Sequence, residues 1–294
     1  MYKTMANLNS TDISFAPLLF YAIYTAETVL CVFSLLLAPF AGLALMRAGV
    51  IHRNFRLCCV SAVIQLVIAC STRFILLFYQ LFDLPRDDVL LIVVSILRDE
   101  FFGYFSSVFG AITLERLVAT LHTEWYEKEK GTLHVFIIVQ AVLVLPSLAN
   151  ALLWIFMTIP GFVNYAFFAV QLVISGSSFL AIYCWNKRLL EKAEVQYIDY
   201  SVSRTFQLRE NIGMMKVRGF EFDESSYTFS VAFLFYGCYI FLPDHLKNVR
   251  SFCVAMFDAW SALEQVVIMY LLIKRNQAVF NKFEQLPFVR GVRK

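Results

Sequence analysis

The sequence predicts an all-α integral membrane protein, a bundle of seven transmembrane helices with its N-terminus outside the cell. Three observations support this fold class. Of the 294 residues 60% are hydrophobic and only 16% are charged, whereas about a quarter of the residues in a soluble domain are charged. The apolar residues fall into seven segments, most of them near the roughly 20 residues that a helix needs to cross a bilayer. The basic residues between the segments gather on one side.

The first segment is too long for the apolar part of a signal peptide, and the polar stretch before it carries a single basic residue, Lys3. We therefore expect this segment to remain in the mature protein. The sixth segment is short and is expected to extend inward through the amphipathic stretch before it. In chain order, the seven helices are expected at 18 to 46, 57 to 82, 89 to 114, 133 to 159, 162 to 186, 227 to 243 and 251 to 273.

The count of Lys and Arg in each loop predicts the orientation. Nineteen of these residues lie in the loop at 47 to 56, the region 115 to 132, the loop at 187 to 226 and the tail from Lys274, against four on the other side. Because the basic side faces the cytoplasm, the N-terminus is expected outside.

This orientation gives the chain three parts, and the sequon at Asn9 falls in the first of them, where glycosylation is expected to be feasible. The parts are an extracellular tail at 1 to 17, a seven-helix transmembrane domain at 18 to 273 and a cytoplasmic tail at 274 to 294. The spaced aromatic and basic residues of the last part are suited to an amphipathic helix on the inner leaflet of the lipid bilayer.

Several function classes lack support in the sequence. Cysteine pairs with metal-ligand spacing, clustered histidines and phosphate-binding glycine loops are all missing from it, so neither a metal nor another cofactor is predicted. A membrane enzyme is the weakest alternative, because no catalytic constellation is visible, and nucleic acid binding is not implied. A seven-helix transporter is disfavoured because an odd count of seven segments does not divide into two repeated halves.

Glu115 and Arg116 stand together near the inner end of the third segment. One interpretation is interfacial snorkelling, in which Arg116 reaches into water and Glu115 neutralises it. The other is a latch, which is closed while the two are paired and open when Arg116 turns toward a cytoplasmic partner. An acid and an arginine at the base of the third of seven helices is the arrangement of G-protein-coupled receptors.

Two motifs make that resemblance specific. The stretch "ERLVATLHTEWYEKEK" resembles the close of the third helix in nematode serpentine chemoreceptors, with matching positions at Glu115, Arg116, Ala119, Thr120, Tyr126 and Glu127. The stretch at 200 to 217 resembles the signature before their sixth helix, with matches at Tyr200, Ser203, Phe206, Gln207, Leu208, Glu210 and Asn211. Together they are most similar to the Sre class, with the Sra-type classes as near alternatives.

The resemblance implies a chemosensory receptor that is not an enzyme. Such a receptor binds a small environmental molecule, an odorant or pheromone, on the outside and activates a heterotrimeric G protein inside. It implies a multi-pass protein of the plasma membrane, in sensory neuron cilia. We assign coupling to Glu115, Arg116, Glu210 and Asn211, with Glu210 or Asn211 facing Arg116 at rest. The alternative is a seven-helix transporter or ligand-gated channel.

Further ionisable residues fall inside the apolar segments. Glu27 and Arg73 lie at similar depth in the first two segments, Asp258 lies about 10 Å deep in the seventh and Glu264 lies deeper. Groups at such depth generally face the bundle interior and need partners. We therefore consider Glu27, Arg73 and Glu264 as candidates for structural ion pairs, and Arg73 with Asp258 as a candidate ligand-contacting patch.

Arg98, Asp99 and Glu100 form a second candidate ligand site, about 24 to 27 Å above Arg116 along the third helix. Three adjacent side chains cannot share one helix face, so at least one is expected to point into the bundle.

Overall fold

A computed structural model of the chain describes residues 16–48, 53–82, 88–122, 132–156, 158–195, 212, 230–274 and 277–286. Nearly all of these residues are helical. The elements are α2 (Pro17–Arg47), α3 (Arg53–Leu81), α4 (Val89–Leu121), α6 (Thr132–Ile155), α7 (Gly161–Val195), an unlabelled helix at Ser230–Phe241, the short 3-10 helix η2 (Asp244–Leu246), α9 (Lys247–Lys274) and α10 (Gln277–Glu284).

Each of the seven expected segments contains a helix. By length and composition, five of the helices in the described ranges can cross a membrane: α2, most of α3, most of α6, most of α7, and α9. The other two are α4, which carries several charges along its 33 residues, and the 230–241 helix, which is shorter. The third segment was expected to end at 114, but α4 continues to Leu121. Leu117, Val118 and Ala119 continue the helix after the Glu115–Arg116 pair.

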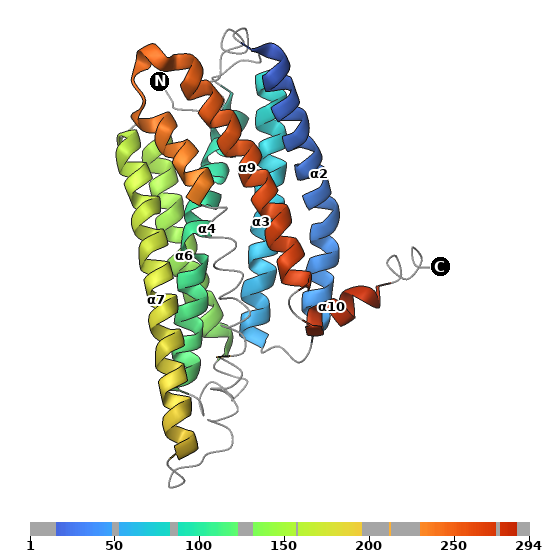
Figure 1. Cartoon of the computed structure of the whole chain (residues 1–294), viewed down its shortest axis with the longest axis vertical. Coiled ribbons are helices and arrows are strands. Elements are labelled where there is room, and N and C mark those ends of the chain that lie inside the picture. Colours follow the sequence, from blue (N-terminus) through green and yellow to red (C-terminus); the bar gives the residue numbers. More distant parts are fainter. Residues whose placement is uncertain are drawn as a thin grey trace.

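The long helices lie side by side, and α10 lies across the lower end of α2 and α9 (Figure 1). The centre of the bundle is α4, which packs against α3, α6 and α7, while α2 packs against α3 and α9. A residue of α4 can therefore reach almost every other helix, and α4 is the helix that carries most of the candidate site residues.

Close approach of α4 to its neighbours depends on two glycines. A Cβ atom at Gly103 would lie 2.7 Å from the Cβ of Ser147 on α6, and one at Gly110 would lie 2.8 Å from the Oγ of Ser175 on α7. Small residues at such crossings let helix backbones approach closely in membrane bundles, where packing and hydrogen bonds hold helices together. The glycines therefore fix the position of α4 against α6 and α7.

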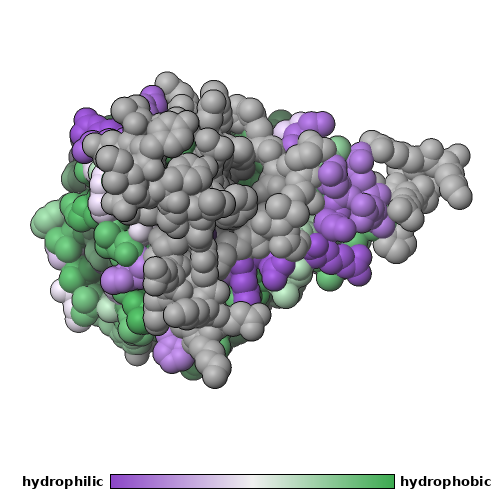
Figure 2. All heavy atoms as spheres, turned by 90° about the horizontal axis from the view of Figure 1, so that it is seen from below, coloured by the Kyte–Doolittle hydropathy of each residue, from purple (hydrophilic) through white to green (hydrophobic). Residues whose placement is uncertain are grey.

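The polarity of the bundle matches a protein surrounded by lipid. Apolar side chains face outward, with Leu18 on α2 85% exposed and Val173 on α7 65% exposed. In contrast, Arg73, Arg98 and Arg116 are among the largest fully buried side chains. Seen from the lower end, apolar residues cover one side of the bundle and hydrophilic residues mark the α10 region (Figure 2).

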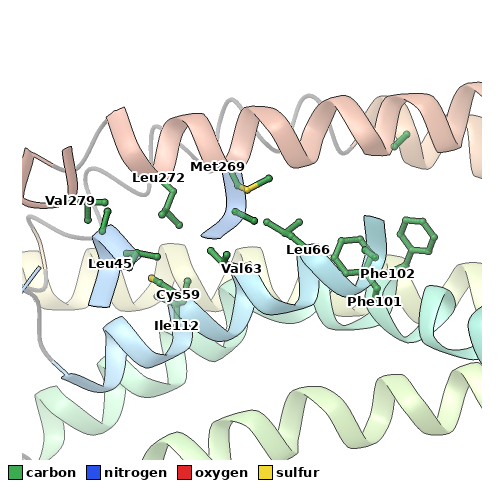
Figure 3. Packing of buried hydrophobic residues seen from close by; sticks show 14 of the residues in the cluster. Leu45, Cys59, Val63, Leu66, Phe101, Phe102, Ile112, Met269, Leu272 and Val279 are labelled. Atoms are coloured by element: carbon green, nitrogen blue, oxygen red, sulfur yellow. The ribbon is translucent and has the colours of Figure 1, made fainter. Parts of the chain in front are cut away.

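The main apolar core lies between α3, α4 and α9 (Figure 3). Val63 and Leu66 of α3 face Met269 and Leu272 of α9, with Phe102 of α4 at one end of the cluster. These residues are each less than one-tenth exposed. The core joins α9 to α3 and α4, while α9 packs mainly on α2, and the charged residues described below lie within these four helices.

The predicted amphipathic tail helix is α10. Its Val279 is fully buried and joins the core next to Leu45 of α2, and the Lys274 ammonium lies 5.1 Å from the centre of the Phe280 ring. The apolar side of α10 thus packs on the protein itself.

Candidate functional site

One carboxylate, Asp258 on α9, joins two arginines at the centre of the bundle. Its Oδ1 lies 2.9 Å from Nη2 of Arg98 on α4, and its Oδ2 lies 3.1 Å from Nη2 of Arg73 on α3. Arg73 also binds Glu27 on α2 through Nε and through Nη2, the latter at 2.9 Å from Oε2. We call Glu27, Arg73, Arg98 and Asp258 the Asp258 network.

The Asp258 network balances two acids against two bases among four helices. All four residues are at most 4% exposed. A buried charge is costly unless it is paired and hydrogen-bonded, and the network meets both conditions. Arg98 adds a bond from Nη1 to the Ala69 carbonyl at 3.3 Å and lies over the Phe102 ring at 4.9 Å. The structure thus brings Arg73 together with both of the partners considered from the sequence, and adds Arg98, whose partner the sequence left open.

Asp99 faces a different neighbour of α4 than Arg98 does. It accepts a hydrogen bond of 3.2 Å from Nδ2 of Asn164 on α7, which also donates to the Tyr236 hydroxyl at 3.1 Å. The Oδ1 of Asn164 in turn accepts from Asn150 on α6. Asp99, Asn150, Asn164 and Tyr236 form what we call the Asn164 network, which links α4, α6, α7 and the 230–241 helix.

Sequence analysis missed Asn150, Asn164 and Tyr236. The available signal was the presence of amide side chains inside the fourth and fifth apolar segments, because an amide side chain in a lipid-embedded helix generally hydrogen-bonds to a neighbouring helix. Asp99 differs from Arg98 in having no ion pair within the described residues, and its Oδ2 has no hydrogen-bond partner.

Glu100 and Glu264 are the two other buried carboxyls without an ion pair in the part of the chain that the structure describes. Each is 4% exposed, and the Oε1 of each has no hydrogen-bond partner. Glu264 was grouped with the intramembrane ion pairs from its sequence position, but both central arginines are already bound to Glu27 and Asp258. Glu264 instead lines a small cavity between α4, the 230–241 helix and α9.

Near the inner end of α4, Glu115 and Arg116 bind each other. Nη2 of Arg116 lies 2.8 Å from Oε1 of Glu115, and Nε lies 2.5 Å from Oε2. Arg116 is 2% exposed and Glu115 is fully buried, so the arginine head does not extend into water as snorkelling requires. The next turn is held to α7, because the Thr120 hydroxyl contacts Oδ1 of Asn186 at 3.1 Å and the Arg116 carbonyl.

Three sequence assignments, Glu210, Asn211 and Asn9, lie outside the described residues. The pairing of Glu210 or Asn211 with Arg116 and the glycosylation of Asn9 stay predictions. Within the described ranges, no group of three or more His, Cys, Asp or Glu residues is arranged to hold a metal ion.

Comparison with known proteins assigns the family. The family model for the Sre G protein-coupled chemoreceptors matches residues 83–294, which include α4 to α10 and both sequence motifs. No curated protein matches the chain. The family match agrees with the helical membrane bundle and with the class that the two motifs resemble. The chain therefore belongs to the Sre family of G protein-coupled chemoreceptors.

Proposed function

We propose that the protein takes up a small environmental molecule from the extracellular side into its helical bundle and activates a heterotrimeric G protein at its inner end. Family membership supports a chemoreceptor in general terms. In the cell we place this multi-pass membrane protein in the plasma membrane, in the cilia of a sensory neuron, and we assign it no catalytic activity.

The observation that carries the proposal is the placement of two charged sites on one helix. Arg98 and Arg116 are 18 positions apart on α4, which is about 27 Å at 1.5 Å per residue. A ligand that moves α9 against α4 changes the Arg98–Asp258 contact, and α4 transmits that movement as a single rigid element. Coupling between distant sites requires an element that can take two positions, with the balance between them influenced at both sites. We propose that α4 is this element.

At the inner end, the Glu115–Arg116 pair acts as the latch. At rest the guanidinium is bound to its neighbouring carboxylate, and in the active state Arg116 is released to the G protein. Glu210 and Asn211 are proposed to face Arg116 in the resting state and to leave it together with Glu115.

The test is nucleotide exchange by a heterotrimeric G protein reconstituted with the full chain in lipid nanodiscs. Glu115→Gln weakens the latch while keeping the shape of the side chain, so it is expected to raise exchange in the absence of ligand by several-fold. Arg116→Ala is expected to abolish exchange. Matched controls are Glu191→Gln and Arg188→Ala, which make similar changes at exposed positions of α7 and are expected to leave exchange unchanged.

Exchange that is the same in wild type, Glu115→Gln and Arg116→Ala would overturn the latch. A ligand-gated ion current that persists in cells without G proteins would favour the channel alternative. A swap in which Arg116→Glu is rescued by Glu210→Arg would support their pairing, and absence of rescue would remove it.

A further inference from the structure

The cavity beside Glu264 has a volume of about 20 Å³, roughly the space that one water-sized group needs. It lies between α4, the 230–241 helix and α9, and half of the residues that line it are aromatic. Its rings belong to Phe101, Phe102, Phe105, Phe233 and Phe257. Such a lining presents the negative faces and positive edges of several rings to whatever occupies the cavity.

Glu264 gives this aromatic cavity one acidic group. Its side chain is 4% exposed, its Oε1 has no hydrogen-bond partner, and it has no ion pair with any described residue. An ionisable group at membrane depth is costly without a partner. Because Arg73 and Arg98 are bound to Glu27 and Asp258, neither is available to supply the positive charge.

The wider balance of charge points the same way. Among the described residues buried in the bundle, Asp99, Glu100 and Glu264 have no ion pair, whereas Arg73, Arg98 and Arg116 all have one. The interior therefore has more acidic than basic groups, and a ligand with a positive charge would improve its balance.

The lining selects among positively charged groups. Divalent metal ions take six or more oxygen ligands, whereas this cavity offers oxygens mainly from Glu264, Ser261 and Gln265. The oxygen of Gln265 already accepts a contact from the Cys70 thiol at 2.8 Å. Aromatic rings around a carboxylate instead suit an ammonium group, which is attracted to ring faces by the cation–π interaction and to the carboxylate by charge.

We infer that this cavity binds the ammonium group of a small primary amine, with Glu264 as its counter-ion and the phenylalanines as its cage. The inference rests on the proposed receptor function, since it names the ligand class of that receptor. Glu264 lies six positions after Asp258 on α9, or about 9 Å, and Phe257 both lines the cavity and precedes Asp258. An ammonium group there is positioned to shift α9 at the Asp258 network.

The test uses the full chain purified in nanodiscs, with methylammonium chloride as the probe. Thermal unfolding is measured with methylammonium chloride, sodium chloride or tetramethylammonium chloride at equal ionic strength. A ligand that binds only the folded state raises Tm as its concentration increases. Methylammonium is expected to raise Tm in a saturable way, while sodium and the bulkier tetramethylammonium are not.

Variants identify the site. Glu264→Gln is expected to abolish the methylammonium effect, and Phe105→Leu is expected to weaken binding about threefold, as the loss of one cation–π contact predicts. Glu191→Gln changes an exposed carboxylate and is expected to keep the effect. Equilibrium dialysis of radiolabelled methylammonium against wild type and Phe105→Leu gives the same comparison if Glu264→Gln does not fold.

Three outcomes would overturn the inference: an equal rise in Tm with sodium, a rise that persists in Glu264→Gln, or no rise in wild type, which would mean that the carboxyl is satisfied by a proton. These outcomes are separate from the latch experiment. If methylammonium does not raise the Tm of the wild type but Glu115→Gln still raises nucleotide exchange, only the ligand class is rejected. If methylammonium raises the Tm of the wild type but Glu115→Gln and Arg116→Ala leave exchange unchanged, G-protein activation is rejected and the amine site stands.

Discussion

Asp258 on α9 binds Arg98 on α4 with 2.9 Å between Oδ1 and Nη2. Both side chains are almost fully buried, so this ion pair stands in the interior of a bundle that faces lipid. The same carboxylate also binds Arg73 on α3, which makes Asp258 the residue on which most of the central charge balance depends.

Replacing Asp258 by Asn is therefore expected to be costly. The change keeps the shape of the side chain but leaves Arg98 without an acidic partner, and breaking a buried ion pair generally costs about 3 to 5 kcal/mol. Thermal unfolding of the purified protein measures the loss. The control Glu191→Gln should change stability by less than about 0.5 kcal/mol, as is usual for surface positions. An equally small change in Asp258→Asn would show that the network contributes little.

The Asn164 network gives a second prediction. Asn164→Leu removes the donor to Asp99 and to the Tyr236 hydroxyl and the acceptor for Asn150, and these three groups are buried. Leaving buried polar groups unsatisfied costs about 1 to 3 kcal/mol. We expect a corresponding drop in unfolding free energy, and almost none for Val163→Leu, an exposed change one position earlier. Equal stability of the two variants would contradict the network.

The crossing of α4 and α6 is tested at Gly103. Gly103→Ala places a Cβ 2.7 Å from the Cβ of Ser147, so the helices must move apart, and overpacking of this kind typically costs about 1 to 3 kcal/mol. Gly42→Ala is the matched control, because its nearest atom, Cγ1 of Val63, is 4.0 Å away. There we expect unchanged or slightly raised stability. Partial rescue of Gly103→Ala by Ser147→Gly would locate the cost at this contact.

The stability of the protein is expected to depend on pH through Asp88, which lies immediately before the first residue of α4. The Tyr79 hydroxyl and then the Leu90 backbone N–H, at 2.9 Å from Oδ1, hold the pKa of Asp88 below its usual value. Because the pKa of Asp88 is lower in the folded state than in the unfolded state, its ionised carboxylate stabilises the fold at pH values above the unfolded-state pKa of about 3.9. This stabilisation is lost as the pH falls through the folded-state pKa.

The stability difference between wild type and Asp88→Asn should accordingly narrow as pH drops below about 4, because Asn does not titrate. Urea unfolding at a series of pH values measures this difference. Because Asp88 is exposed, the effect is expected to be small. A difference that is constant from pH 7 to pH 3 would show that the carboxylate does not contribute through its charge.

Hydropathy predicted where the helices lie, because the bilayer requires long apolar segments whatever their contacts. It was less informative about their ends: α4 and α7 continue past the expected boundaries to Leu121 and Val195, where helix-forming residues continue beyond the lipid. Hydropathy also gave no information on the rotation of each helix about its axis, and this rotation decides which side chains of neighbouring helices meet. Depth along the chain made Glu27, Asp258 and Arg73 compatible, but only the packed bundle brings Arg98 to Asp258 and Asp99 to Asn164.

The family model begins at residue 83, so Glu27 on α2 and Arg73 on α3, which bind each other inside the bundle, both lie before the matched region. Because Glu27 and Arg73 are ion-paired, we expect these two positions to change together during evolution. If a variant replaced Glu27 alone, Arg73 and Arg98 would share the single carboxylate of Asp258, which would leave one uncompensated positive charge inside the lipid-facing bundle, so a change at Glu27 should be followed by a matching change at Arg73.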